Sequence, residues 1–116
     1  STAEFAGDET VTQDCESFSR VYSALSNADL GFTSFQVLDA EEWTERVGAA
    51  QQTLTGVVDA SASPLKGALA DFQGVVSGNA TSVGAALEGA EEPVSRITDT
   101  CNANQSPVAV TAEFGG

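Results

Sequence analysis

The sequence predicts an all-α protein, an up-and-down four-helix bundle, and three observations support this fold class. Apolar residues recur at every third or fourth position over most of the 116 residues. Capping residues and prolines divide the chain into helical segments. Two cysteines, Cys15 and Cys101, occupy apolar positions in the first and last segments, which favours a disulfide between those helices over two buried free thiols. We expect one domain with an N-terminal arm (1–9), a bundle (10–104) and a tail (105–116).

The first helix is predicted to begin at Thr10, which has the form of a capping box with Gln13. It should end within 27–30, where Gly31 can take the left-handed cap conformation. Segment 30–38 is apolar and aromatic without a clear period, so a strand-like connector and a helical turn over one end of the bundle are both open. The apolar positions of this helix are Val11, Cys15, Phe18, Tyr22 and Leu25.

The second helix is predicted to be capped by Asp39, with Glu42 three residues later. Ser63 followed by Pro64 should cap and start the third helix after a sharp reversal, and that helix should end near Val76. The apolar positions of the second helix are Trp43, Val47, Ala50, Leu54, Val57 and Ser61.

The fourth helix is predicted to run from Ala80 to Asn102, with a kink or short break at Pro93. The alternative is a single bent helix over 64–102. Four elements fit better, because a ~39-residue helix would be nearly 60 Å long, far beyond the ~25–35 Å of the first two helices. The apolar positions after Pro64 are Leu65, Leu69, Phe72, Val76, Val83, Ala86, Ala90, Val94, Ile97 and Cys101.

The tail alternates apolar residues at Val108, Val110, Ala112 and Phe114, which is a weak strand pattern. Its last six residues, TAEFGG, repeat the TAEFAG of residues 2–7 almost verbatim. We interpret the repeat as coincidence, with pairing of the two arms across one end of the bundle as the structural alternative.

Composition excludes several functions. A net charge of −13 with four basic residues argues against binding to nucleic acid or anionic membranes, which need Lys and Arg to replace phosphate counterions. The chain has no histidine, so Ser–His and Cys–His nucleophiles are excluded. The densest carboxylate cluster, 39–45, lies at a helix start where acids are expected, and no EF-hand-like loop occurs. We therefore expect no enzyme, no cofactor and no metal site.

Three of the basic residues each follow a glutamate by four residues, the favourable order for an ion pair on a helix. These predicted pairs explain the arginines without a ligand. They are Glu16–Arg20, Glu42–Arg46 and Glu92–Arg96.

The aromatic residues give the best indication of a site, since five of the eight fall within 26 residues. They either fill one end of the bundle or form a docking patch for a protein partner. The candidate interaction residues are Tyr22, Phe32, Phe35 and Trp43. A competing hypothesis makes the protein a carrier, with a small apolar ligand in a dry pocket bordered by Tyr22, Phe35 and Trp43.

The cysteines also bear on the compartment, because a disulfide indicates an oxidising environment. Their context is Asp14-Cys15-Glu16 in the first helix and Asp99-Thr100-Cys101-Asn102 at the end of the last. Over residues 10–102 this acidic, Ala/Gly/Val/Thr-rich pattern resembles the small exported helical domains of actinobacterial cell envelopes. The resemblance implies an extracytoplasmic protein with a protein partner in the envelope, as an accessory subunit of a complex. Many such domains are lipid-anchored, and an anchor here would lie upstream of Ser1.

Overall fold

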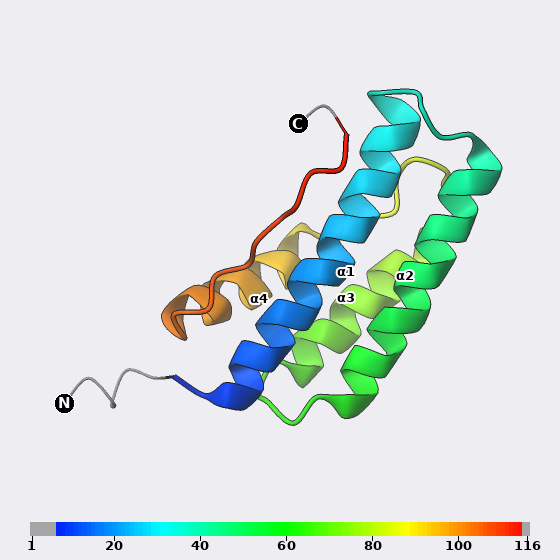
Figure 1. Ribbon diagram of the computed structural model, residues 1–116. Coiled ribbons are helices and arrows are strands. Elements are labelled where there is room, and N and C mark those ends of the chain that lie inside the picture. The colour runs from blue at the N-terminus through cyan, green and yellow to red at the C-terminus, as the bar shows by residue number, and fades with distance from the viewer. Residues whose placement is uncertain (1–6, 115–116) are drawn as a thin grey trace.

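The computed structural model describes residues 7–114 and confirms the all-α prediction. Four helices run up and down, and the tail leaves the last helix and returns along the first (Figure 1). No helix in this described range is long and apolar enough to cross a lipid bilayer. The helices are α1 (Glu9–Thr33), α2 (Ala40–Ala60), α3 (Lys66–Gly78) and α4 (Glu91–Ala103).

The core is filled by the side chains that the helical period singled out. The ring centroids of Phe18 on α1 and Phe72 on α3 lie 5.0 Å apart in an edge-to-face contact, and Tyr22 stacks on Phe18. Val83 is the exception, because it belongs to the predicted apolar positions but is exposed. The largest fully buried side chains are Trp43, Phe18, Phe72, Leu25, Leu54, Leu69 and Ile97.

The predicted bounds of α1 are wrong at both ends. Asp8, and not Thr10, is the N-cap, since its carboxylate accepts hydrogen bonds from the Thr10 amide at 2.8 Å and the Thr10 hydroxyl at 2.5 Å. The hydrogen bond from the Thr10 hydroxyl also lowers the pKa of Asp8. At the other end the helix continues through Gly31 to Thr33. Gly31 is required for steric reasons and not as a helix cap, because a Cβ at this position would lie 2.7 Å from side-chain atoms of both Leu38 and Phe114.

Segment 30–38 is therefore divided between the last turn of α1 and a short connector. The connector folds back on the helix, since the amides of Val37 and Leu38 both donate to the carbonyl of Gly31. Leu38 is buried, whereas Phe35 and Val37 face solvent. The helical alternative is thus realised for residues 30–33, whereas residues 34–38 form an irregular connector without a strand.

The start of α2 is confirmed in full: Asp39 and Glu42 form a reciprocal capping box. The predicted start of α3 is two residues early. The Ser63 hydroxyl accepts from the Leu65 amide and donates to the Asp14 carboxylate, so Pro64 lies in a turn before the helix. Asp14 also accepts from Ser61, and this buried carboxylate fixes the α2–α3 turn against α1.

The prediction of a fourth helix from Ala80 is wrong, because residues 79–90 form a series of turns. Gly84 and Gly89 have positive φ angles of 88° and 79°, which interrupt a right-handed helix. The side-chain amide of Asn79 closes the segment by donating to the carbonyls of Ala86 and Glu88. Pro93 consequently lies in the first turn of α4, where a proline causes no clash with a preceding turn.

The disulfide between Cys15 and Cys101 is confirmed, and it joins α1 to α4 across 86 residues of sequence. Both cysteines are buried in the core. The link matters for α4, because α1 packs mainly against α2 and makes few other contacts with α4. Among the four helix pairs that pack side by side, α1–α2, α2–α3, α3–α4 and α1–α4, the covalent bond thus joins the pair with the least packing.

Candidate functional site

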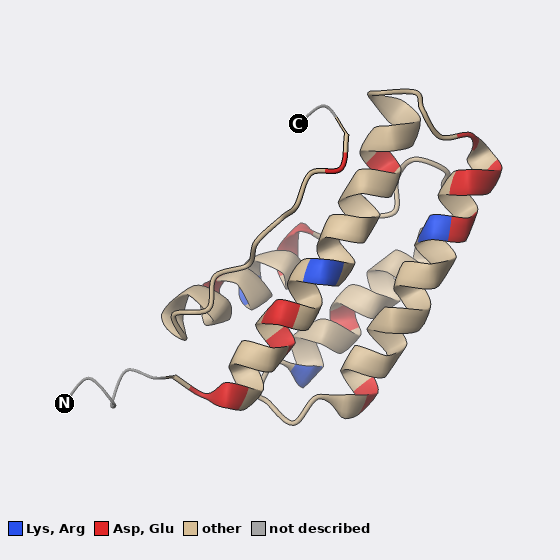
Figure 2. Cartoon of the chain, viewed as in Figure 1, with Lys and Arg blue, Asp and Glu red and all other residues tan. Residues whose placement is uncertain are grey.

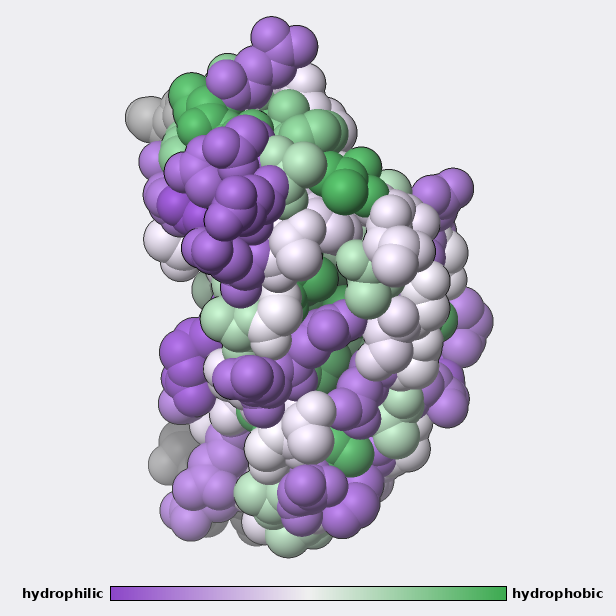
Figure 3. All heavy atoms as spheres, turned by 90° about the vertical axis from the view of Figure 1, so that its right-hand side faces the viewer, coloured by the Kyte–Doolittle hydropathy of each residue, from purple (hydrophilic) through white to green (hydrophobic). Residues whose placement is uncertain are grey.

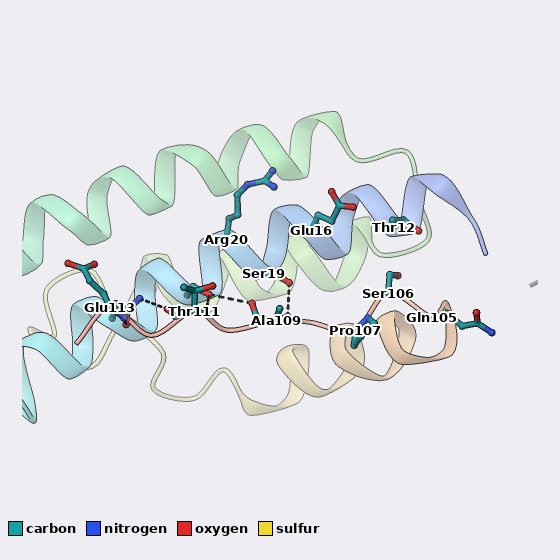
Figure 4. A pocket seen from close by; sticks show the side chains of 12 residues that line it. Thr12, Glu16, Ser19, Arg20, Gln105, Ser106, Pro107, Ala109, Thr111 and Glu113 are labelled. Carbon is teal, nitrogen blue, oxygen red and sulfur yellow. Dashed lines mark hydrogen bonds between the residues drawn. The ribbon is translucent and has the colours of Figure 1, made fainter. Parts of the chain in front are cut away.

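The tail lies extended along α1 and is held there by polar side chains of the helix (Figure 4). Ser19 accepts a hydrogen bond from the amide of Ala109 at 3.0 Å, and Ser23 accepts one from the amide of Thr111 at 2.9 Å. Asn27 binds twice, accepting from the amide of Glu113 at 3.0 Å and donating to the carbonyl of Thr111 at 2.8 Å. The described part of the tail forms no strand, so the weak strand pattern marks an extended segment that pairs with a helix.

The spacing of the two elements explains why they fit. Ser19, Ser23 and Asn27 are four residues apart, which is a rise of about 6.0 Å along a helix. The three amides that they bind are two residues apart, which is about 6.6 Å along an extended chain. One face of α1 therefore meets one edge of the tail at each step, much as a neighbouring strand would.

The end of the tail is fixed by side chains as well as by its backbone. Arg46 on α2 makes two hydrogen bonds with the Glu113 carboxylate, at 2.8 and 3.0 Å. The hydrogen bond from Arg46 lowers the pKa of Glu113, and the same bond raises the pKa of Arg46. The Arg46 guanidinium also lies 5.4 Å from the centroid of the Phe114 ring. The Phe114 ring lies against Gly31, where the absence of a Cβ leaves room for it. The ring centroids of Phe114 and Phe35 are 6.3 Å apart.

We call the residues that receive the tail the tail seat. They combine backbone recognition with one charged and one aromatic contact. The tail seat consists of Ser19, Ser23, Asn27, Gly31 and Arg46.

A groove of about 850 Å³ runs beside the tail and is open to solvent. Its walls come from α1, including Thr12, Glu16 and Arg20, and from the tail, residues 105–113. Figure 4 shows Glu16 and Arg20 pointing away from the tail. The groove thus lies beside the bound tail, and it leaves one side of the tail seat open to solvent.

The start of the tail is anchored at the opposite end of α1. Asn104 accepts from the amide of Asp8 at 2.7 Å, and its own amide donates to the Thr12 hydroxyl at 3.0 Å. Residues 1–6, which hold most of the predicted arm (1–9) and the first TAEF copy, lie outside the described residues. The tail is thus hydrogen-bonded to α1 at its start by Asn104, and again at every second residue from Ala109 to Glu113.

The predicted aromatic candidates are not brought together. Trp43 is fully buried, and its indole Nε1 donates to Asp29 at 2.8 Å. Tyr22 packs on Phe18 inside the bundle, whereas Phe35 is 43% exposed beside the tail. Phe32 is partly buried, and a Cβ at Gly84 would lie 3.0 Å from its ring. The pocket expected between Tyr22, Phe35 and Trp43 is therefore not assembled from these side chains.

Exposed apolar side chains gather instead at the end of the molecule that carries the α1–α2 connector. Five large hydrophobic side chains are exposed within residues 7–114, and four of them lie at this end. One of the four, Val83, belongs to the 79–90 segment, which packs against the end of α1. In Figure 3 apolar surface is visible at this upper end. We call this patch the apolar cap; it consists of Leu30 (41% exposed), Phe35 (43%), Val37 (56%) and Val83 (38%).

Carboxylates are spread over the described helices and do not converge on a site (Figure 2). No group of three metal-ligating side chains occurs within residues 7–114. Asp29 is partly buried and accepts from the Trp43 indole and from the amides of Ala86 and Leu87. Its hydrogen bonds join α1, α2 and the 79–90 segment, which is a structural role.

Only one of the three predicted ion pairs is confirmed. Arg96 binds Glu92, and it also binds Asp71 of α3. Arg46 pairs instead with Glu113 of the tail, which is 67 residues away, and Arg20 donates a hydrogen bond to Ser17.

The tail seat was not predicted from the sequence, because Ser19, Ser23 and Asn27 resemble the solvated face of an amphipathic helix. The signal available was their four-residue spacing opposite a tail that alternates with a period of two.

Comparison with known proteins adds no relative: no protein-family model, no curated protein and no solved structure matches this chain. Its function is therefore inferred from the geometry of the chain itself.

Proposed function

We propose that this protein is a non-catalytic protein-interaction domain that works outside the cytoplasm, as an accessory subunit of a cell-envelope complex. The observation that carries the proposal is the apolar cap. Four large apolar side chains face solvent at one end of a molecule whose core is otherwise filled. Exposed apolar patches of this kind are typical of surfaces that are covered by a partner.

Charge around the apolar cap indicates what the partner surface looks like. Asp39, Glu41 and Glu42 lie at the start of α2, directly after the connector, and Figure 2 shows acidic residues at this end. Their field, together with the net charge of −13, repels acidic surfaces and attracts basic ones. The partner that fits is a protein with an apolar centre and a rim of Lys or Arg.

The extracytoplasmic location is supported by the Cys15–Cys101 disulfide, since disulfides persist mainly in oxidising compartments. The carrier hypothesis depends on side chains that lie apart, and no observation favours it. Asp14 and Asp29, the two carboxylates of residues 7–114 that are not exposed, are both occupied by structural hydrogen bonds, so neither is free to act as a general acid or base.

Site-specific photo-cross-linking in cells that produce the protein tests the interface. A cross-linkable amino acid at Val37 should give one adduct of discrete mass, whereas the same amino acid at Gln52, which is exposed on α2, should give none. Raising the salt concentration should reduce the yield at Val37 because it screens the acidic rim. An adduct from Gln52 with none from Val37 would refute the apolar cap as the interface.

The compartment is tested separately by trapping cells in acid and then alkylating free thiols in denaturant, because Cys15 and Cys101 are buried and would resist the reagent in the folded protein even when reduced. We expect both cysteines to be protected from alkylation. Alkylation of Cys15 and Cys101 in the trapped protein would contradict an extracytoplasmic location.

A further inference from the structure

The tetrapeptide TAEF occurs twice in this chain, at 2–5 and at 111–114. The structure gives the second copy a defined binding site. Ser23 and Asn27 bind the backbone of Thr111, and Arg46 binds the carboxylate of Glu113. The Phe114 ring rests beside Arg46 and over Gly31.

The tail seat is selective for this sequence at two positions. The paired hydrogen bonds from Arg46 match a carboxylate, which is the geometry that a guanidinium recognises best. The missing Cβ of Gly31 leaves room for a ring next to that carboxylate, because a Cβ would lie 2.7 Å from Phe114. The first copy carries the same two features, Glu4 and Phe5, in the same adjacent order.

The first copy cannot reach the tail seat of its own molecule. Gly7 is held at the N-terminal end of α1, where a Cβ would lie 2.8 Å from the Asn104 carbonyl oxygen. From Glu9 to Gly31 the helix rises about 33 Å. Phe5 precedes Gly7 by only two residues, which span at most about 7 Å. A first-copy TAEF in the tail seat must therefore come from another molecule.

We propose that the tail seat accepts residues Thr2–Phe5 of a second copy of this chain in place of its own Thr111–Phe114. The contact is head-to-tail, since the donor uses one end of the molecule and the acceptor the other, and such contacts build rings or open filaments when repeated. The chain's own tail competes from an effective concentration in the millimolar range, so exchange is favoured where molecules are crowded or the tail is released.

The test uses the 116-residue chain with its own copy disabled by Glu113→Gln and Phe114→Ala. In sedimentation velocity this variant should self-associate as its concentration rises from about 10 μM to 1 mM. Its association constant should be at least tenfold larger than that of the unmodified chain. Adding Glu4→Gln and Phe5→Ala should make it monomeric again. Adding Arg46→Ala instead should do the same, whereas Arg20→Ala is the matched control and should leave association intact.

Two results would overturn the proposal. One is a Glu113→Gln, Phe114→Ala variant that stays monomeric at every concentration, and the other is association that survives Glu4→Gln and Phe5→Ala. A labelled STAEFAG peptide provides a second readout. It should bind the Glu113→Gln, Phe114→Ala variant at least tenfold more tightly than the unmodified chain, and equal affinity or preference for a scrambled peptide would count against exchange.

Discussion

The bundle core and the tail seat are held together by different forces, although α1 contributes to both. The inner face of α1 buries Phe18 and Leu25 against neighbouring helices, and Cys15 adds a covalent bond. Its outer face binds the tail through hydrogen bonds of Ser23 and Asn27, and no apolar side chain of the described tail is more than partly buried. Burial in the core excludes water from large side chains, whereas the tail is held by individual hydrogen bonds to α1.

This difference separates a permanent part of the molecule from a replaceable one. Removing a core side chain leaves a cavity that nothing else fills. Removing the tail leaves polar groups on α1 that water, or another extended chain, can satisfy. We therefore expect perturbations of the core to change global stability, and perturbations of the tail to change local opening.

The largest expected effect on the core is the loss of the disulfide. Replacing Cys15 and Cys101 together by Ala should lower the free energy of unfolding by about 4–5 kcal/mol on the chain-entropy model, because the closed loop is long. Chemical denaturation of the variant and the unmodified chain measures the difference. A loss below about 1 kcal/mol would show that α4 is held by packing alone.

Truncating a core aromatic should cost nearly as much. Phe72→Ala removes a fully buried ring that contacts Phe18, and we expect a loss of about 4 kcal/mol in denaturant unfolding. Val110→Ala in the tail is the control, since Val110 is 53% exposed and should change stability by less than about 0.5 kcal/mol. Similar losses for the two variants would contradict the division between core and tail.

A smaller effect is expected from the polar junction at Asp29. Asp29→Asn replaces a carboxylate oxygen by an amide donor facing the donors of Trp43, Ala86 and Leu87, which should cost about 1–3 kcal/mol. The effect should also shift the fluorescence of Trp43, the only tryptophan. Asp59→Asn, at an exposed site on α2, serves as the matched variant and should be neutral.

The docking of the tail should respond to pH through the Arg46–Glu113 pair. Arg46 lowers the pKa of Glu113 in the docked tail, so this pair stabilises docking above the ordinary glutamate pKa of about 4.3 and the stabilisation is lost as pH falls through the lowered value. NMR signals of the Glu113 amide should report release of the tail in acid while core signals persist. Glu113→Gln should abolish this pH dependence, and an unchanged acid transition in that variant would refute it.

The fold was largely predictable because most of its signals are local. The capping box of Asp39 and Glu42 specifies the start of α2 within four residues, and the helical period located the buried side chains. One failure is also local, the choice of Thr10 over Asp8 as the cap of α1. The other involves a longer distance, because the turns at 79–90 depend on Asn79, Gly84 and Gly89 together with Asp29 from α1.

The candidate site was less predictable for the same reason. The sequence left open whether the aromatic residues fill the bundle end or face a partner, and the structure divides them: Phe35 is exposed, whereas Trp43 is buried with its indole bound to Asp29. The pairing of Arg46 with Glu113 crosses 67 residues, so a helical neighbour such as Glu42 was the natural assignment from sequence. Only the path of the tail reveals which polar residues of α1 bind a backbone.

Native-state hydrogen exchange tests the division between core and tail most directly. We expect the amides of Ala109, Thr111 and Glu113 to exchange through local opening that is insensitive to low denaturant, while buried amides of α1 near Leu25 exchange only on global unfolding. Tail and core amides that exchange together, with the same dependence on denaturant, would show that the tail is an integral part of the bundle and would contradict the account.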